Sequence, residues 1–278
     1  MKQDKPPPQA AVGALMRCRR AVVVGDPQQV EPVVALPDVL TMAMLREFDA
    51  DPDRFSAPSA SVQTLADEAS DHCATFATAG GSRTVGAPLL VHRRCASPMF
   101  DISSRIAYGG LMVQAKLPEQ SHIRKTLGES HWIDVQGTAR EKYCPEEGQV
   151  LLRLLRTLRQ NAVAPDIYVV TPFAAVQDGL RQLVKQDGVL EGWVSDCSSW
   201  AYERISTVHT VQGREAEAVI IVLGAPEAGQ SGARRWAGST PNLLNVAVTR
   251  AKEAVYVIGN RALWSGEGNF SVLAQKLR

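Results

Sequence analysis

Short apolar runs and amphipathic segments alternate regularly from residue 89 to the end of the chain. The runs are rich in Val and Ile and predict strands, whereas the segments repeat apolar residues every three or four positions and predict helices. The predicted strands are residues 89–91, 132–135, 167–171, 205–208, 218–223 and 254–258. The predicted helices are residues 98–107, 146–160, 174–186, 241–252 and 271–277. This alternation is typical of an α/β fold with a parallel sheet covered on both faces, in which ligands bind outside the carboxyl ends of the strands.

The predicted helix 241–252 shows the pattern most clearly. Thr240 can cap its N-terminus and Pro241 suits the first helical position. Its apolar residues share one face, which we expect to be buried: Leu243, Leu244, Ala247, Val248 and Ala251. Arg250 lies on a different row, so the helix is expected to present one guanidinium outward at its edge.

The first 88 residues are less regular. Residues 8–20 predict a short amphipathic helix, and residues 21–24 (Ala-Val-Val-Val) predict a buried strand with an exit turn at Gly25-Asp26. Residues 36–88 are turn-rich, and only residues 62–77 favour a helix. The predicted organisation is therefore a segment 1–35, a linker with helical pieces over 36–88, and a domain over 89–278.

Composition narrows the class of protein only slightly. A chain of 278 residues with 45% hydrophobic content can bury one large core, or one core and a partial second. The five cysteines form no C-x-x-C pair and have no histidine at ligand spacing, which argues against zinc and disulfides and favours a reducing cytosol. No apolar run has the length of a membrane span, so a soluble cytoplasmic protein without membrane contact is expected. A net charge of +1 neither supports nor excludes a nucleic-acid partner.

Five segments carry candidate chemistry. They are residues 25–32 (Gly-Asp-Pro-Gln-Gln-Val-Glu-Pro), 92–94 (His-Arg-Arg), 171–173 (Thr-Pro-Phe), 207–215 (Thr-Val-His-Thr-Val-Gln-Gly-Arg-Glu) and 241–252. Singly, each has an ordinary explanation: a tight turn, a solvated arginine pair, a plain strand end or a surface arginine. Together and in this order, they resemble motifs III to VI of superfamily 1 helicases, in the branch typified by the Upf and Dna helicases. The resemblance implies a second RecA-like domain of the P-loop NTPase type from residue 89, after a short remnant of a preceding RecA-like domain.

The resemblance also implies a nucleotide site. Gln29 would hydrogen-bond the terminal phosphate, which suits an amide that both donates and accepts. Arg94 and Arg250 would act as arginine fingers, because arginine is planar, always charged and bidentate. Glu215 would bind the nucleotide sugar or pair with the arginines. The residues expected at the nucleotide are Gly25, Asp26, Gln29, Arg94, Gly213, Glu215 and Arg250.

A second set would line the path of single-stranded DNA or RNA. Thr171, Thr207, His209 and Thr210 offer hydroxyl and imidazole donors that can hold phosphate oxygens without reading bases. Phe173 would either pack or stack on a base. Thr171, the segment from His209 to Glu215, and Gly25-Asp26 are all expected at the carboxyl ends of strands.

Two motifs of the family are absent from this sequence, the phosphate-binding loop and the magnesium-binding acidic motif. No G-x-x-x-x-G-K-[ST] string occurs, and Asp67-Glu68 stands downstream of Gly25 in a polar stretch, where the magnesium-binding acid of the family does not lie. No metal site is predicted. ATP and Mg²⁺ are expected only if an upstream RecA-like domain, in cis or in a separate chain, completes the site. The expected function is the C-terminal part of an ATP-dependent helicase, inactive in hydrolysis by itself. The alternative is a non-hydrolysing nucleic-acid-binding or interaction module.

Overall fold

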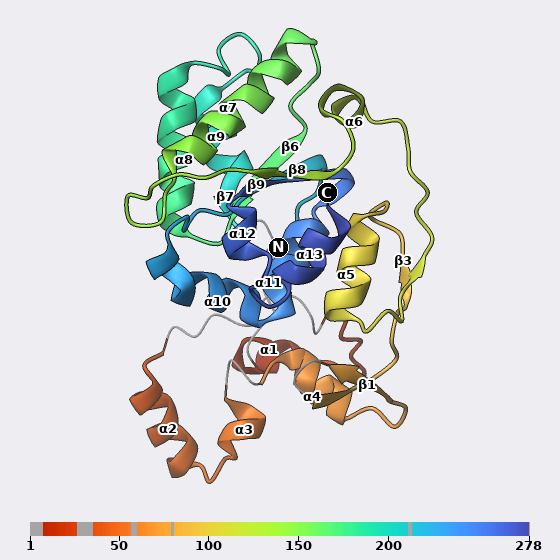
Figure 1. Cartoon of the computed structure of the whole chain (residues 1–278). Helices are drawn as coiled ribbons and strands as arrows, with labels where there is room; N and C mark the ends of the chain where they lie inside the picture. The colour runs from red at the N-terminus through yellow and green to blue at the C-terminus, as the bar shows by residue number, and fades with distance from the viewer. Residues whose placement is uncertain (1–7, 27–35, 57–59, 79–80, 211–212, 278) are drawn as a thin grey trace. The chain divides into compact units, whose positions relative to one another are not determined.

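The chain divides into two compact units, Met1–Leu90 and Val91–Arg278. The computed structural model describes residues 8–26, 36–56, 60–78, 81–210 and 213–277 (Figure 1). None of the helices in these ranges combines the length and apolar character needed to cross a bilayer.

The first unit contains short helices and one hairpin. The helices are α1 (Pro8–Leu15), α2 (Asp38–Glu47), α3 (Pro52–Phe55) and α4 (Val62–Glu68). The hairpin pairs β1 (Ala74–Thr78) with β2 (Gly81–Val85) in antiparallel register. Asp67 on α4 accepts the backbone N–H of Gly86 at 2.9 Å, so this carboxylate holds the hairpin exit to the helix.

Three predictions for this unit are wrong. The helix predicted over residues 8–20 ends at Leu15. Residues 21–24 form no strand, and the side chains of Val22 and Val24 are 89% and 80% exposed. A strand requires a neighbour for its backbone groups, and no strand among the described residues pairs with this run. The helix predicted over 62–77 ends at Glu68, because residues 74–78 pair across the hairpin, where the Thr75 and Thr84 hydroxyls lie 3.1 Å apart.

A five-stranded parallel sheet forms the core of the second unit. Its strands are β5 (His131–Asp134), β6 (Ile167–Thr171), β7 (Ile205–Thr207), β8 (Ala216–Val222) and β9 (Ala251–Gly259). The order across the sheet is β5-β9-β8-β6-β7, and every described pairing is parallel. The central strands are almost wholly buried, as their continuous Val and Ile runs require. The predicted α/β class is confirmed.

Helices cover both faces of this sheet. Figure 1 shows α7 (Pro145–Gln160), α8 (Ala174–Asp187) and α9 (Cys197–Arg204) on one side. On the other side lie α5 (Met99–Ala107), α11 (Pro241–Val248) and α13 (Phe270–Lys276). The remaining helices of this unit are α6 (His122–Leu127), α10 (Ser231–Ser239) and α12 (Arg261–Trp264), with a 3-10 turn η1 at Ala228–Gln230.

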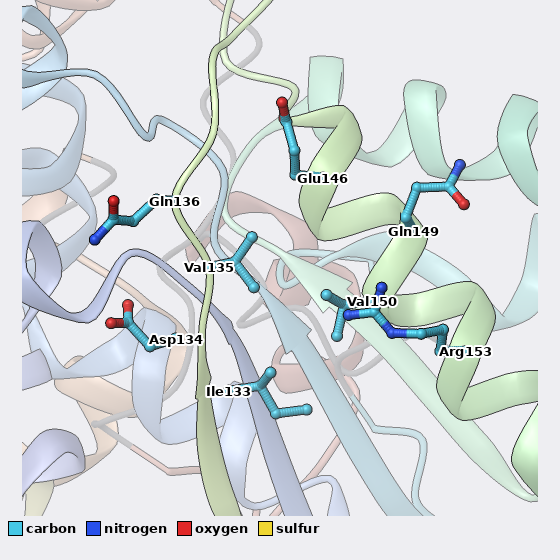
Figure 2. Close-up of a pocket in the computed structure, with 8 residues that line it drawn as sticks. All are labelled: Ile133, Asp134, Val135, Gln136, Glu146, Gln149, Val150 and Arg153. Atoms are coloured by element: carbon cyan, nitrogen blue, oxygen red, sulfur yellow. The ribbon is translucent and has the colours of Figure 1, made fainter.

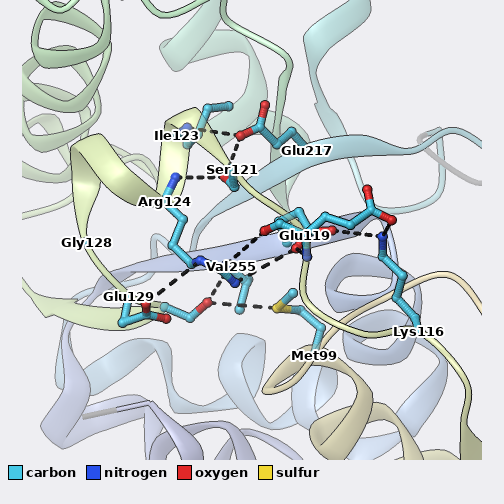
Figure 3. A network of polar contacts seen from close by, with 12 residues as sticks. Met99, Lys116, Glu119, Ser121, Ile123, Arg124, Gly128, Glu129, Glu217 and Val255 are labelled. Carbon is cyan, nitrogen blue, oxygen red and sulfur yellow. Dashed lines mark hydrogen bonds and ion pairs between the residues drawn. The ribbon is translucent and has the colours of Figure 1, made fainter.

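The strand predicted at residues 89–91 does not join the main sheet. The strand β3 (Val91–His92) instead pairs in parallel with β4 (Val113–Gln114), and both are short. The chain after β4 is tied to the main sheet by buried charges (Figure 3). Glu253 on β9 accepts the Glu119 backbone N–H at 2.9 Å and pairs with Lys116 at 3.1 Å.

The helix predicted over 241–252 is too long. Thr240 occupies the N-cap position and Pro241 the first turn, although the Thr240 side chain makes no capping hydrogen bond. The helix α11 ends at Val248, and Ala251 already belongs to β9. Arg250 therefore lies in the connection between a buried helix and a buried strand.

Candidate functional site

The sheet places the predicted residues at two opposite edges. Thr171 and Thr207 end β6 and β7, which are parallel and adjacent, and so lie at the carboxyl edge. Glu215 immediately precedes β8 and Arg250 immediately precedes β9, which places both at the amino edge. The prediction that the whole segment from His209 to Glu215 lies at the carboxyl edge is wrong, because the chain must return to the start of β8.

Three segments far apart in the sequence meet at the amino edge. The Ala216 N–H donates to the Arg250 carbonyl at 3.0 Å, and the Ala96 N–H donates to the Lys252 carbonyl at 2.9 Å. The residues after β3 therefore lie beside the starts of β8 and β9. We refer to Arg94, Glu215, Arg250 and Lys252 as the amino-edge cluster.

In this cluster, the Glu215 carboxylate pairs with two cations, Arg94 and Lys252. Glu215 Oε2 lies 3.2 Å from Arg94 Nε, and its Oε1 lies 3.3 Å from Lys252 Nζ. The Arg94 side chain is 37% exposed, and the other two are similarly accessible. Exposed pairs of this kind contribute about 0–1 kcal/mol, so an anionic ligand can replace Glu215 as the partner of either cation. Two cations sharing one carboxylate suit a phosphate group.

Arg250 is oriented differently from the prediction. Its side chain is 1% exposed rather than outward-facing. Its Nε donates to the Val246 carbonyl at 3.1 Å, and its Nη1 donates to the Arg214 carbonyl at 3.1 Å. The reason is the early end of α11, which leaves carbonyl groups at the helix C-terminus for a cation to satisfy. In this arrangement Arg250 fixes the backbone next to Glu215.

Local geometry around Arg94 and Glu215 is also fixed. The Cys95 N–H donates to His92 Nε2 at 3.2 Å, which closes the turn that carries Arg94. Burial raises the pKa of the Cys95 thiol to about 12, against the opposing effect of the nearby Arg94 and Arg250 charges, so the thiol is neutral and unreactive. Gly213 has a φ of 81°, a left-handed conformation that glycine adopts readily.

At the carboxyl edge, the segment 171–173 is buried. The Thr171 side chain is inaccessible, and its Oγ1 lies 3.4 Å from the Phe173 N–H that it accepts. Phe173 is 7% exposed and packs with Trp264 at a ring separation of 6.3 Å. The packing alternative for Phe173 is confirmed. Base stacking by Phe173 and phosphate contact by Thr171 do not fit this arrangement, because Thr171 is inaccessible and only 7% of Phe173 is exposed.

The turn after β7 is accessible. His209 and Thr210 are exposed, and Thr207 is half-buried. Thr210 Oγ1 donates to the Thr207 carbonyl at 2.9 Å, and the Thr207 N–H donates to Gln177 Oε1 at 2.9 Å. The turn is thus held by α8, and its exposed residues His209 and Thr210 are accessible to a ligand.

The remaining predicted residues belong to the first unit. Gln29 lies outside the described residues, so its role stays a prediction. At Gly25, a Cβ atom would lie 2.3 Å from Gln63 Oε1, so close packing on α4 accounts for this glycine. Asp26 is half-buried. Within the described ranges, no group of three or more His, Cys, Asp or Glu side chains could hold a metal ion.

A separate hollow lies between β5 and α7. Figure 2 shows its apolar wall of Ile133, Val135 and Val150 and a polar rim that includes Gln149 and Arg153. Its volume is about 350 Å³. No residue predicted from the sequence lines it.

Lys252 is the member of the amino-edge cluster that sequence reasoning missed. It ends the segment 241–252, but its side chain was expected on a helix. As the second residue of β9, Lys252 faces Glu215 instead. Only the position of the helix end could have indicated this.

Comparison with known proteins gives the family. A family model described as an AAA domain matches residues 86–262, more than half of the chain. The mouse and human proteins named 3'-5' exoribonuclease HELZ2 are each 28% identical over 153 residues, which is 52% of this chain and 5% of theirs. The chain thus spans only a small part of the curated relatives that it matches. A solved C-terminal domain of a possible DNA helicase from Lactobacillus plantarum has 13% identity and a TM-score of 0.38, covering 66% of this chain and 93% of that one.

Proposed function

Because the chain belongs to the AAA domain family and carries a superfamily 1 helicase C-terminal domain, we propose that it supplies the second RecA-like domain of an ATP-dependent nucleic-acid helicase. The observation that carries this proposal is the amino-edge cluster. Residues from three separate motif segments meet there around one exposed carboxylate and two exposed cations. Residues so far apart in the sequence are not expected to meet at one surface site unless they share a function.

Arg94 is the proposed phosphate-contacting residue. It is exposed, and its only described ion pair is with the solvent-accessible Glu215. Replacing that carboxylate with a phosphate oxygen would preserve the charge balance of the guanidinium. As charge develops on the transferred group, a bidentate arginine stabilises the transition state more than the bound nucleotide.

Arg250 has a positioning role in this proposal. Its hydrogen bond to the Arg214 carbonyl holds the backbone that carries Glu215. A direct phosphate contact by Arg250, as the resemblance implies, would require its guanidinium to exchange the Val246 and Arg214 carbonyls for the ligand.

ATP and Mg²⁺ are the proposed cofactors. When bound, they would supply the phosphoryl group and neutralise its charge. The cations of the amino-edge cluster fit a polyphosphate, but the described residues offer no carboxylate set for magnesium. The proposal therefore requires an upstream RecA-like domain, in cis or in a separate chain, for a complete site.

Single-stranded DNA or RNA is the proposed partner at the carboxyl edge. Thr207, His209 and Thr210 present donors without any arrangement that would read bases, which suits movement along a strand of any sequence. The alternative, a non-hydrolysing nucleic-acid-binding module, gains support from the burial of Arg250.

An NMR titration of the intact chain with ATP tests the phosphate assignment. The expected result is a shift of the Arg94 Nε–Hε signal at millimolar ATP, with smaller changes near Lys252. Arg156 is a matched control, because it is an exposed arginine on α7 that pairs with Asp187. Equal shifts of both arginines would indicate nonspecific anion binding and would contradict the proposal.

A further inference from the structure

An exposed tryptophan lies next to the buried segment 171–173. Trp236 on α10 is 53% exposed, and its ring centroid is 6.0 Å from that of Phe173 with an interplanar angle of 33°. Behind it, Phe173 packs on Trp264, which in turn meets Phe270 edge-on at 4.7 Å. The indole is therefore the accessible end of a row of aromatic rings whose other members are buried.

The helix that carries this indole is held rigidly. Arg234, the second residue before Trp236, is 3% exposed, and its Nη1 donates to the carbonyls of Ala225 at 2.8 Å and Glu227 at 2.6 Å. This buried anchor ties α10 to the chain that leaves the carboxyl end of β8. A ligand that stacks on Trp236 would lose little binding energy to ordering the protein.

Positive charge and hydroxyl groups accompany the indole at the same edge of the sheet. Lys142 Nζ lies 5.5 Å from the centroid of the Phe173 ring, and Arg235, which precedes Trp236 on α10, is also exposed. Phe173 follows the end of β6, and Thr207 ends the neighbouring β7. An aromatic platform among cations, with sequence-tolerant donors nearby, is the arrangement that single-stranded nucleic acids use.

We propose that Trp236 is a base-stacking residue, on which one base of a single-stranded DNA or RNA rests while Arg235 and Lys142 attract the adjacent phosphates. This inference rests on the proposed nucleic-acid partner and assigns the stacking role to Trp236 in place of Phe173. A stacked base needs only a π-face, so the contact has no sequence preference.

Binding of a fluorescent oligothymidylate of about 12 nucleotides to the intact chain at low salt tests the proposal. Trp236→Ala should lower affinity at least about fivefold, and Trp236→Phe should retain most of it. The slope of affinity against salt should not change in Trp236→Ala, because stacking releases no counterions, whereas Arg235→Ala should reduce the slope. Trp236→Phe should also remove most of the quenching of tryptophan fluorescence on binding.

The matched control is Tyr202→Ala. Tyr202 is a 69% exposed aromatic residue at the opposite, amino end of β7, with Arg181 stacked on its ring at 4.7 Å. Equal losses in Tyr202→Ala and Trp236→Ala, or wild-type binding and quenching in both Trp236 variants, would overturn the inference alone. Complete absence of oligonucleotide binding by the wild-type chain would overturn the proposed partner, and this inference with it. A circular dichroism melt identifies a Trp236→Ala variant that fails to fold, in which case Trp236→Phe quenching decides the outcome.

Discussion

Replacing Glu147 with glutamine should make the second unit more stable at alkaline pH. Glu147 on α7 is fully buried, and its Oε2 accepts the Gly224 N–H at 2.7 Å. Its Oε1 has no hydrogen-bond partner among the described residues. Burial raises the pKa of this carboxyl to about 8 from its ordinary value of 4.5, and the Gly224 hydrogen bond only partly opposes that effect.

The direction of this pH dependence follows from the number of protons bound by the folded and unfolded states. Between pH 4.5 and about 8 the folded state keeps a proton that the unfolded state releases, so the free energy of unfolding falls as pH rises through this range. At about 1.4 kcal/mol per pH unit, the full interval amounts to roughly 5 kcal/mol. Glutamine stays neutral and keeps an oxygen for Gly224, but its buried amide nitrogen needs a partner, which costs about 1–3 kcal/mol. The expected gain of Glu147→Gln is therefore about 2–4 kcal/mol at pH 9, against a small loss at pH 5.

Urea unfolding at pH 5, 7 and 9 measures this difference. All five tryptophans of the chain lie between residues 132 and 264, so tryptophan fluorescence reports on the second unit alone. Glu191→Gln, at an exposed position, is the control and should change stability by less than about 0.5 kcal/mol at each pH. If the Glu147→Gln and wild-type free energies differ by the same amount at all three pH values, the buried-acid reasoning is refuted.

Four further outcomes are expected. The purified chain should show no nucleic-acid-stimulated ATP hydrolysis in a phosphate-release assay; turnover that disappears in Arg250→Ala would contradict this. The affinity of the chain for single-stranded DNA or RNA should be weak, independent of sequence and steeply dependent on salt, and His209→Ala should lower this affinity further. Competition assays that reveal a strong preference for one sequence would argue against a translocation path. A third test joins a RecA-like domain with a phosphate-binding loop ahead of Pro8. In this fusion, Arg94→Ala should reduce turnover by up to about 10³-fold with little change in nucleotide affinity, and Arg94→Lys should restore little of the lost turnover. Near-wild-type activity in Arg94→Lys would contradict the assignment of Arg94 to the phosphate site. Arg250→Ala should lower the unfolding free energy by about 3 kcal/mol, because it removes a buried side chain together with its hydrogen bonds to the Val246 and Arg214 carbonyls. A urea midpoint equal to that of Arg94→Ala would show that Arg250 is not a structural anchor.

The local sequence pattern was sufficient to predict a helix or strand wherever the apolar residues of a segment clearly followed a single periodicity. The strand at residues 167–171 was predicted with its observed limits, and the helices α7 and α8 were predicted to within one residue of theirs. The motif order was also enough to identify the family. Such features depend on residues close together in the chain, and their periodicity is visible without knowledge of the partners.

Other outcomes depended on contacts between distant segments. Residues 21–24 have the composition of a buried strand, yet Val22 and Val24 are exposed, since apolar composition alone does not provide a neighbouring strand. The pattern around Val248 is compatible with a longer helix, and only the pairing of Ala251 with Ala216 places Ala251 in β9 instead.

The sequence by itself therefore determined the fold class, the order of the main strands and helices of the second unit, and three of the four charged residues of the amino-edge cluster. Only the tertiary structure decided that Arg94 is accessible, that Arg250 is buried under the end of α11, and that Lys252 shares Glu215 with Arg94. The physical reason is that residue type and spacing fix local backbone preference, whereas the exposure and partners of a side chain depend on which distant segments pack against it.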